Sequence, residues 1–166
     1  MAAANGGAMI NPDTPDAPWG TVETRLDPIH SAARLRDVEI VQRELNAGVE
    51  VDVVNGRAAN GDGGNTALWF AAQGPPPAGL EVARVLIKAG AEINRKCEHG
   101  RTALQMAAAW GHLDMVQLLI DNGANPNICD DEGMTPFMIA SRSKRAPEAN
   151  LKQVIEYLNT LIRRAP

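Results

Sequence analysis

The chain has 166 residues, of which 45% are hydrophobic and 22% are charged, and this size fits one globular domain or one short repeat array. Its 16 basic and 20 acidic residues give a formal net charge of -4, too even a balance to predict nucleic acid or an anionic membrane as the main partner. Residues 1–20 have neither a basic stretch nor a continuous apolar segment, and no apolar run in the chain reaches the length of a bilayer span. We therefore expect a cytoplasmic protein without membrane insertion, with the nucleus or export by a non-classical route as alternatives.

The first part of the chain is rich in alanine, glycine, asparagine, aspartate and proline. A segment of this composition buries too little apolar surface to offset the entropy lost on ordering. We predict a flexible tail over residues 1–24 and a folded domain over residues 25–166.

From Asp27 onward the chain is similar to itself. Thr102 aligns with Thr135 at a shift of 33 residues and with Thr66 at a shift of 36, while Asp27 aligns one copy earlier at a shift of 39. The extra residues fall in the segment QGPPPAG and in the loop rich in glycine and asparagine before Thr66, where insertions are expected. A period near 33 residues indicates stacked repeats that share one continuous core.

Each copy predicts a pair of helices, and the third copy does so most clearly. Thr102 has the hydroxyl of a helix N-cap and Gly111 breaks the helical pattern, so a short first helix is predicted through Ala109. A second helix is predicted from about Leu113 to Asp121, with a wide apolar face and a glycine stop at Gly123. Neither helix is long enough to be stable alone, so the pairs must stack on one another.

The third copy, GRTALQMAAAWGHLDMVQLLIDNGANPN, and the later segment GMTPFMIA resemble the ankyrin-repeat consensus. The resemblance implies an all-α ankyrin-repeat solenoid of four helix-turn-helix repeats with hairpin-loop fingers, over approximate residues 26–60, 61–96, 97–129 and 130–166. The consensus histidine is kept only at His30. Its equivalents in the later copies are Trp69, Gln105 and Met138, and Asp27 replaces the first consensus threonine.

The fourth copy has the features of a terminal cap. It carries the insertion RSKRAPEANLKQ, and we expect its last helix, Val154 to Ile162, to dock on the third copy. Its basic residues raise a nucleic-acid-associated regulator as an alternative function. Because interleaved aromatic residues are lacking and the chain is acidic overall, a solvated cap face is the favoured interpretation. The basic residues are Arg142, Lys144, Arg145, Arg163 and Arg164.

The resemblance also implies a function class, which is reversible protein binding without chemistry. We expect a monomeric adaptor, scaffold or inhibitor that binds a protein partner and that uses no cofactor, metal or small-molecule substrate. An accessory subunit of an enzyme complex is a further alternative.

Catalysis has little support in the sequence. The three serines lie outside any Gly-x-Ser-x-Gly turn, and the three histidines form no metal-binding helix motif. We expect His30 to make a hydrogen bond between repeats and His112 to cap the following helix. Cys97 and Cys129 are too few for a disulfide framework, so free thiols are expected.

The resemblance places candidate contact residues in a concave groove, on both sides of each hairpin glycine and directly after each Ala-Ala pair. We expect the centre of the site at Trp110 and Arg101, because tryptophan and arginine are the types most often found as binding hot spots. Trp69 occupies the inward histidine position and is expected in the core. The candidate partner-binding residues are Arg34, Leu35, Asn65, Gln73, Glu98, His99, Arg101, Trp110, Asp131, Glu132, Met134 and Arg142, and Asp62, Gly63, Ala109 and Ser143 occupy further groove positions.

A modification site is a further hypothesis from the resemblance. Asn94 and Asn127 stand at the hairpin position that asparaginyl hydroxylation uses in some ankyrin proteins, each with a leucine eight residues earlier. The competing interpretation, which we favour, is that this asparagine ties its hairpin to the neighbouring one through its amide.

Overall fold

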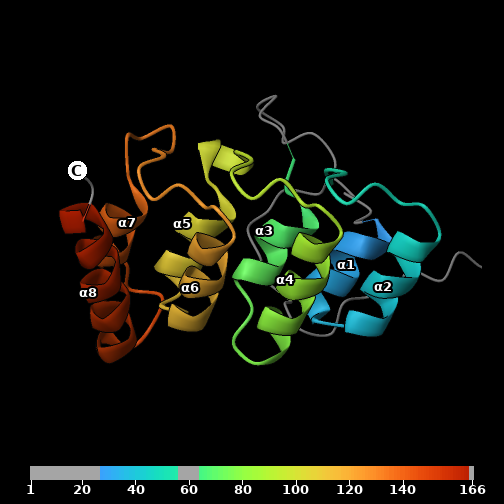
Figure 1. The fold of residues 1–166 in the computed structure, drawn as a ribbon, viewed down its shortest axis with the longest axis horizontal. Coiled ribbons are helices and arrows are strands. Elements are labelled where there is room, and N and C mark those ends of the chain that lie inside the picture. The colour runs from blue at the N-terminus through green and yellow to red at the C-terminus, as the bar shows by residue number, and fades with distance from the viewer. Residues whose placement is uncertain (1–26, 56–63, 165–166) are drawn as a thin grey trace, which may run out of the picture.

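The computed structural model of the protein describes residues 27–55 and 64–164 (Figure 1). The predicted tail, Asp62 and Gly63 lie outside these residues. The described part of the chain contains eight α-helices, one short 3-10 helix and no strand, which confirms the predicted all-α architecture. The helices are α1 (Pro28–Leu35), α2 (Val38–Asn46), α3 (Ala67–Ala72), α4 (Ala78–Lys88), α5 (Ala103–Ala109), α6 (Leu113–Asp121), α7 (Pro136–Arg142) and α8 (Glu148–Arg164), with the 3-10 helix η1 at Glu98–Gly100.

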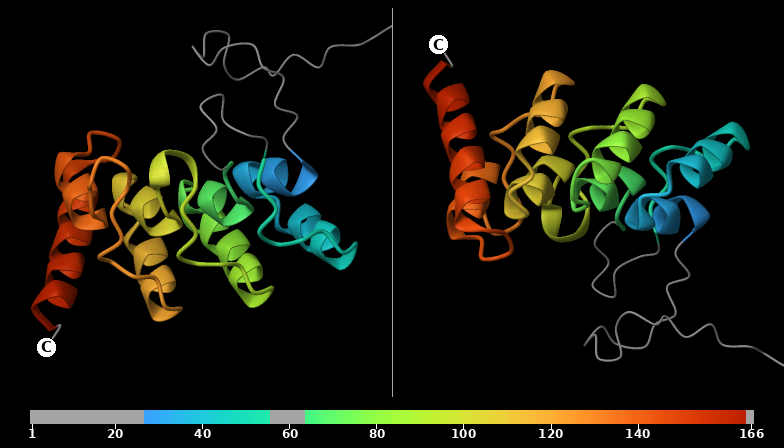
Figure 2. Two further views of the ribbon diagram at one scale, coloured as in Figure 1. Left: turned by 90° about the horizontal axis from the view of Figure 1, so that it is seen from above. Right: turned by 90° about the horizontal axis from the view of Figure 1, so that it is seen from below.

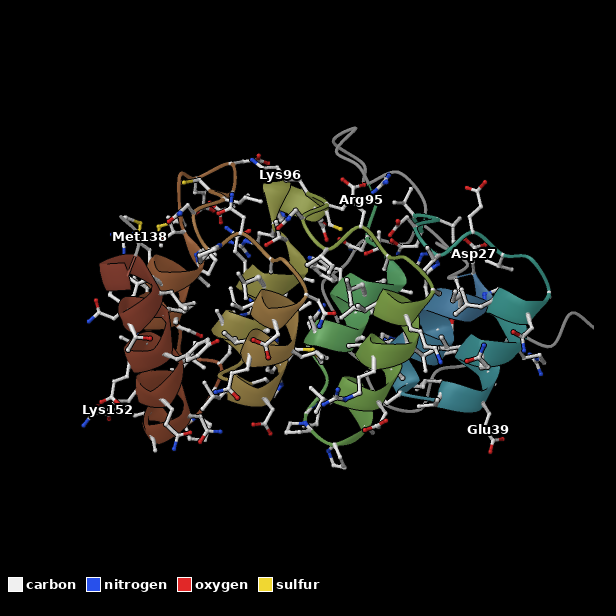
Figure 3. The ribbon with its side chains drawn as sticks, viewed as in Figure 1. Asp27, Glu39, Arg95, Lys96, Met138 and Lys152 are labelled. Atoms are coloured by element: carbon white, nitrogen blue, oxygen red, sulfur yellow. The ribbon has the colours of Figure 1, made fainter. Side chains whose placement is uncertain are left out.

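The helices stack in two layers (Figure 2). The first helices of the pairs pack in the order α1, α3, α5, α7, and the second helices pack in the order α2, α4, α6, α8. The loops that join one pair to the next project from one edge of the stack, where Figure 3 places Arg95 and Lys96. Glu39 of α2 and Lys152 of α8 lie toward the opposite edge (Figure 3). The result is a solenoid in which each pair contacts its neighbours.

Threonine caps start three of the first helices. The hydroxyls of Thr66, Thr102 and Thr135 accept hydrogen bonds from backbone N–H groups three residues later, at 3.3, 3.4 and 3.3 Å. Such a cap satisfies one of the free N–H groups at a helix start and contributes about 1 kcal/mol. The prediction of Thr102 as an N-cap is therefore confirmed. Asp27 stands at the start of α1 and makes no such side-chain bond.

Two glycines end the helices of the third repeat as predicted. Gly111 has φ +66° after α5 and Gly123 has φ +94° after α6, a left-handed conformation that costs other residues about 1–2 kcal/mol. Gly111 is also closely covered, because a Cβ atom there would lie 3.0 Å from the Cβ of Ala146 in the fourth repeat. The predicted helices Ala103–Ala109 and Leu113–Asp121 are confirmed at both ends.

The core runs between the two layers. Leu68 and Leu104 in the first layer and Leu86 and Leu119 in the second are at most 2% exposed, and burial of each such side chain contributes about 1.5–3 kcal/mol. Small residues on the first helices let neighbouring pairs approach closely. These residues are Ala32, Ala33, Ala71, Ala72, Ala107 and Ala108, all buried.

The last helix differs from its prediction. We expected it from Val154 to Ile162, and α8 instead begins at Glu148, inside the insertion. The carbonyl of Pro147 accepts hydrogen bonds from the N–H groups of Asn150 and Leu151, so the helix forms as soon as the chain has passed the proline. The first turn of α8 is polar and exposed, and for this reason the apolar pattern gave no sign of it.

Candidate partner-binding groove

The hairpin loops are held by buried polar side chains at the consensus histidine position. Gln105 is fully buried and donates hydrogen bonds from Nε2 to the carbonyls of Met134 at 2.7 Å and Ile128 at 3.2 Å. Its Oε1 accepts from the backbone N–H of Thr102 at 2.8 Å. Gln105 thus joins the start of α5 to the next hairpin, and it fixes the position of that hairpin relative to the helix.

His30 does the same at the hairpin that follows α2. Its Nε2 donates to the carbonyl of Val53 at 2.8 Å, and the ring is fully buried. Burial lowers the pKa of His30, against opposing effects of the Val53 hydrogen bond and the Asp27 carboxylate. A neutral imidazole that donates to a hairpin carbonyl agrees with the expected structural role, but His30 and Val53 both lie in the first predicted repeat, so this bond does not run between repeats.

His112 corrects a prediction. It stands at the N-cap position of α6 and its side chain does not cap that helix. Its Nε2 donates instead to the carbonyl of Gln73 in the preceding repeat, at 3.1 Å. Burial lowers its pKa, and the hydrogen bond to Gln73 acts in the opposite direction. The histidine therefore joins two repeats at the end of their first helices.

Arg101 is held by carboxylates at the base of the third and fourth hairpins. Its Nε lies 3.2 Å from Oδ2 of the buried Asp130, and its Nη2 lies 3.9 Å from the exposed Glu132. Oδ1 of Asp130 accepts from the N–H groups of Glu132 and Met134. Arg101 faces the groove with only part of its guanidinium, so it is a structural residue as well as a candidate contact.

Asn65 has a different surrounding from the one expected of a contact residue. It is 8% exposed, and its amide both donates to Glu98 Oε2 at 3.2 Å and accepts from the Glu98 N–H at 3.1 Å. Its backbone N–H donates to the side chain of Asn55 at 2.7 Å. These bonds tie the second hairpin to the third and leave little of Asn65 for a partner.

Trp110 lies at the C-cap of α5, half-buried against the core. The guanidinium of Arg145, from the insertion of the fourth repeat, lies 5.5 Å from the centroid of its ring. Its Nε1 is covered and has no acceptor among the described residues. Trp110 therefore packs between the third and fourth repeats, and part of its ring stays exposed.

Three adjoining hollows run along the first helices, and we refer to them together as the groove. The first and second share Arg34, Phe70 and Gln73, and the second and third share Arg101 and Arg145. The first, of about 410 Å³, is lined by Arg34, Arg36, Phe70, Gln73, Gly74, Pro75, Trp110 and His112. The second, of about 460 Å³, adds Asn65, Trp69, Glu98, His99, Arg101, Met106 and Arg145. The third, of about 510 Å³, adds Ala109, Glu132, Met134, Ile139, Arg142, Ser143 and Lys144.

The groove brings most of the candidate residues together. Leu35 and Asp131 are exposed and do not line it, and Leu35 is 68% exposed at the end of α1. His99 lies in the second hollow with φ +58°, at the tip of the third hairpin. Trp69, which was expected in the core, is half-buried and lines the second hollow. The candidates that line the groove are Arg34, Asn65, Gln73, Glu98, His99, Arg101, Trp110, Glu132, Met134 and Arg142.

Several groove residues were missed from the sequence. Arg36 has φ +64° and occupies, after α1, the position that Gly111 has after α5. The repeat alignment alone could therefore have indicated Arg36 as a groove residue. Arg145 lies in an insertion with no counterpart in the other copies, and the sequence carries no signal for its position over Trp110. The basic residues of the fourth repeat were interpreted as a solvated cap without aromatic neighbours. Lys144 and Arg145 instead line the third hollow beside the expected candidate Arg142, and the aromatic ring comes from the third repeat.

The proposed modification positions have different surroundings. The amide of Asn94 donates to the carbonyl of Gly123 at 3.0 Å and accepts from the N–H of Asn125 at 2.8 Å, which is the tie between hairpins that we favoured. Asn127 is exposed, and its backbone N–H donates to the side chain of Asn125. Hydroxylation of either residue stays a hypothesis.

The described residues offer little support for a metal site, a membrane span or a reactive thiol. They include no group of three or more His, Cys, Asp or Glu placed to hold a metal ion. None of the described helices combines the length and the apolar character of a membrane span. Cys97 and Cys129 are free thiols, and burial raises the pKa of Cys97, which makes it a poor nucleophile.

Comparison with known proteins agrees with this architecture. Residues 78–160 match the family model of ankyrin repeats in three copies. The human ankyrin repeat domain-containing protein 63 is 42% identical over 79 residues, which are 47% of this chain and 21% of that protein. The E3 ubiquitin-protein ligase KEG of Arabidopsis thaliana is 32% identical over 144 residues, which are 87% of this chain and 8% of that protein.

A third relative is the human ankyrin repeat, SAM and basic leucine zipper domain-containing protein 1, 32% identical over 127 residues that make up 73% of this chain and 24% of that protein. The chain thus spans less than a quarter of the length of each of these relatives. What they share with it is the repeat array itself. With its stacked helix pairs, its threonine-capped first helices and this match over half of its length, the chain belongs to the ankyrin-repeat family.

Proposed function

We propose that this chain is a non-catalytic protein-binding module, an adaptor, scaffold or inhibitor, and that its partner lies in the groove with contacts centred on Trp110 and Arg101. We place it in the cytoplasm as a monomer. Ankyrin repeats are generally protein-protein interaction modules. The single observation that carries the location is the continuity of the three hollows, which are lined by residues of all four helix pairs.

The chemistry of the groove supports binding over catalysis. The described histidines that reach it include His112, which is committed to the carbonyl of Gln73, and His99, which is exposed beside Glu98. Asp130, the most buried carboxylate nearby, is committed to Arg101 and to two backbone N–H groups. A general acid or base needs a free proton-transferring group at the bound substrate, and His112 and Asp130 are already used by the fold.

Nucleic acid is a weaker alternative on the same surface. The arginines of the groove suit phosphate, and the rings of Trp69 and Trp110 suit a stacked base. The rim of the groove, however, carries the carboxylates of Glu98 and Glu132 beside those arginines. A continuous phosphate backbone would meet these carboxylates along its path, whereas a protein segment can place its charges to avoid them.

Site-specific photo-crosslinking tests the proposal. A photoreactive amino acid is introduced at His99 or Arg142 in the groove, or at Arg84 on α4 as a control, since Arg84 is exposed on the second layer. The full chain is irradiated in lysate of its native cell, and crosslinked proteins are identified by mass spectrometry. We expect the same protein from both groove positions and not from Arg84, with Trp110→Ala weakening its binding by about 1–2 kcal/mol. Recovery of a partner from Arg84 alone would place the binding surface on the second layer and overturn the proposal.

A further inference from the structure

We propose that the groove binds an acidic, extended segment of the partner protein, with carboxylates near both ends of the segment and apolar side chains at its centre. This inference rests on the proposed function and adds the chemical nature of the bound segment. It is carried by the distribution of charge in the groove, by the pairing of that charge, and by the donors between the charged ends.

The two helix layers differ in the charged residues that they carry. The first helices α1, α3, α5 and α7 contain no acidic residue, and they contribute Arg34 and Arg142. All four second helices carry carboxylates, which are mixed with basic residues in α2, α4 and α8. Although the whole chain has a net charge of -4, the first helices, along which the hollows lie, therefore carry only positive formal charge. Such a local field attracts an oppositely charged partner and raises its association rate.

Most arginines of the groove also lack an ionic partner among the described residues, whereas the described arginine side chains of the second layer have one. On the second layer, Arg43 lies 3.0 Å from Glu44 and Arg84 lies 4.0 Å from Glu81. In the groove, Arg101 is neutralised by Asp130. The other groove cations have no carboxylate within 4.0 Å among the described residues. They form one cluster of Arg34 and Arg36 at the first repeat and one of Arg142 and Lys144 at the fourth. Arg145 lies between them, where it lines the second hollow together with Arg34 and also lines the third.

The stretch between these clusters is aromatic and rich in unused donors. Trp69 and Phe70 pack edge to face with their centroids 5.2 Å apart, and Trp110 lies one repeat further. Nε1 of Trp69, Nε1 of Trp110 and Nε2 of Gln73 are covered N–H groups that have no acceptor among the described residues. A buried donor without an acceptor is costly. If the side chains that carry these donors rotate, the donors can bind carbonyl or carboxylate oxygens of a partner. A partner rich in such oxygens therefore gains more binding free energy here than a purely apolar one.

The length of the segment follows from the stack. Neighbouring helices pack about 8–10 Å apart, so the three steps from α1 to α7 span roughly 24–30 Å. An extended chain advances about 3.3 Å per residue, and about seven to nine residues therefore cover this distance. The segment would place carboxylates against both clusters and apolar side chains against Trp69, Phe70 and Trp110.

Fluorescence anisotropy with the full chain and defined peptides tests the inference. The probe is a fluorescein-labelled peptide of about nine residues with glutamates at both ends and leucines at the centre, and the matched control has glutamine in place of glutamate. We expect the glutamate peptide to bind at least about tenfold more tightly, with an advantage that shrinks as salt is added. Equal binding of the two peptides, or no binding of either, would overturn the inference.

Charge-matched variants locate the effect. Arg34→Glu and Arg145→Glu change the net charge as much as Arg43→Glu and Arg84→Glu, and all four side chains lie on the surface, so each variant is expected to fold. We expect the two groove variants to weaken binding of the glutamate peptide by about fivefold or more and the two second-layer variants to change it by less than about twofold. Equal losses of affinity in all four variants would show that the net charge of the chain attracts the peptide, and this result would contradict a binding site in the groove.

Two further results separate this inference from the proposed function. If a partner crosslinks from His99 and Arg142 and its crosslinked segment lacks acidic residues, the groove binds protein and the acidic assignment is wrong. If a labelled oligothymidylate of matched length binds more tightly than the glutamate peptide, the groove is a nucleic-acid surface and both proposals fail.

Discussion

The guanidinium of Arg145 lies over the ring of Trp110, 5.5 Å from its centroid. The two residues come from different repeats, Trp110 from the end of α5 and Arg145 from the part of the insertion that precedes α8. Ser143 strengthens the same joint, because its hydroxyl donates to the carbonyl of Ala109 at 2.6 Å. The insertion therefore folds back onto the third repeat and supplies part of the groove wall, in addition to starting the last helix.

This contact predicts an energetic coupling between the two side chains. In a double-mutant cycle of Trp110→Ala and Arg145→Ala, measured by urea unfolding, we expect the coupling to the free energy of unfolding to be about 0.5–1 kcal/mol, the range of an exposed cation–π pair. The matched control is Arg142→Ala, whose guanidinium contacts the sulfur of Met134 instead. Trp110→Ala and Arg142→Ala should add within error. An additive cycle for Trp110 and Arg145 would show that the contact contributes nothing to folding.

Gln105 gives a second prediction, on stability. Gln105→Ala removes the acceptor of the Thr102 N–H and the donor to the carbonyls of Ile128 and Met134, and it leaves a space in a fully buried position. We expect a loss of about 2–4 kcal/mol in the free energy of unfolding, since unsatisfied buried groups and a cavity each add to the cost.

The control for this variant is taken from the chain itself. Gln105→His introduces the residue that the first repeat has at the equivalent position, where His30 binds the carbonyl of Val53. Because an imidazole can donate to a hairpin carbonyl in the same way, we expect it to lose less than the alanine variant. Chemical denaturation of both variants decides the point, and an alanine variant as stable as the parent would exclude Gln105 as the hairpin anchor.

The local features of the fold were predictable from the sequence, and the contacts between distant segments were not. Both ends of α5 and α6 followed from Thr102, Gly111 and Gly123, because each acts on its own neighbours in the chain. The early start of α8 was missed because its first turn is polar. The position of Arg145 over Trp110 depends on how an insertion folds back, which no repeat pattern encodes.

The candidate site was predictable to a similar extent. The family positions located most of the groove lining, including Arg34, Gln73 and Trp110. They gave no information on which side chains are already bonded, so they did not distinguish Asn65 and Arg101 from residues without such bonds. The pairing of Arg101 depends on Asp130, 29 positions later, and only the stacked structure brings the two together.

Arg101 gives a third prediction, which differs from the one that the sequence supports. Its hot-spot position predicts that Arg101→Ala weakens binding with little loss of folding. In the structure the change leaves the carboxylate of Asp130 buried without its counter-charge. We now expect a loss of about 1–3 kcal/mol in the free energy of unfolding, moderated because two backbone N–H groups still donate to Asp130. Thermal and urea unfolding measure it, and Glu132→Ala serves as the control because its longer, exposed pair of 3.9 Å should contribute little.

The fourth prediction concerns pH. Burial holds the pKa of His30 and His112 below the ordinary value of 6.5 in the folded chain. As the pH falls through about 6.5, the unfolded chain takes up protons at these imidazoles before the folded chain does, so the free energy of unfolding falls with it. His30→Gln should retain a donor to the Val53 carbonyl and lose one of the two titrating groups, and it should therefore lose less stability than the parent between about pH 7.5 and pH 5.5. The exposed His99→Gln is the control and should behave as the parent does. Urea unfolding at each pH gives the slopes, and an unchanged slope in the His30 variant would assign the pH dependence to other groups.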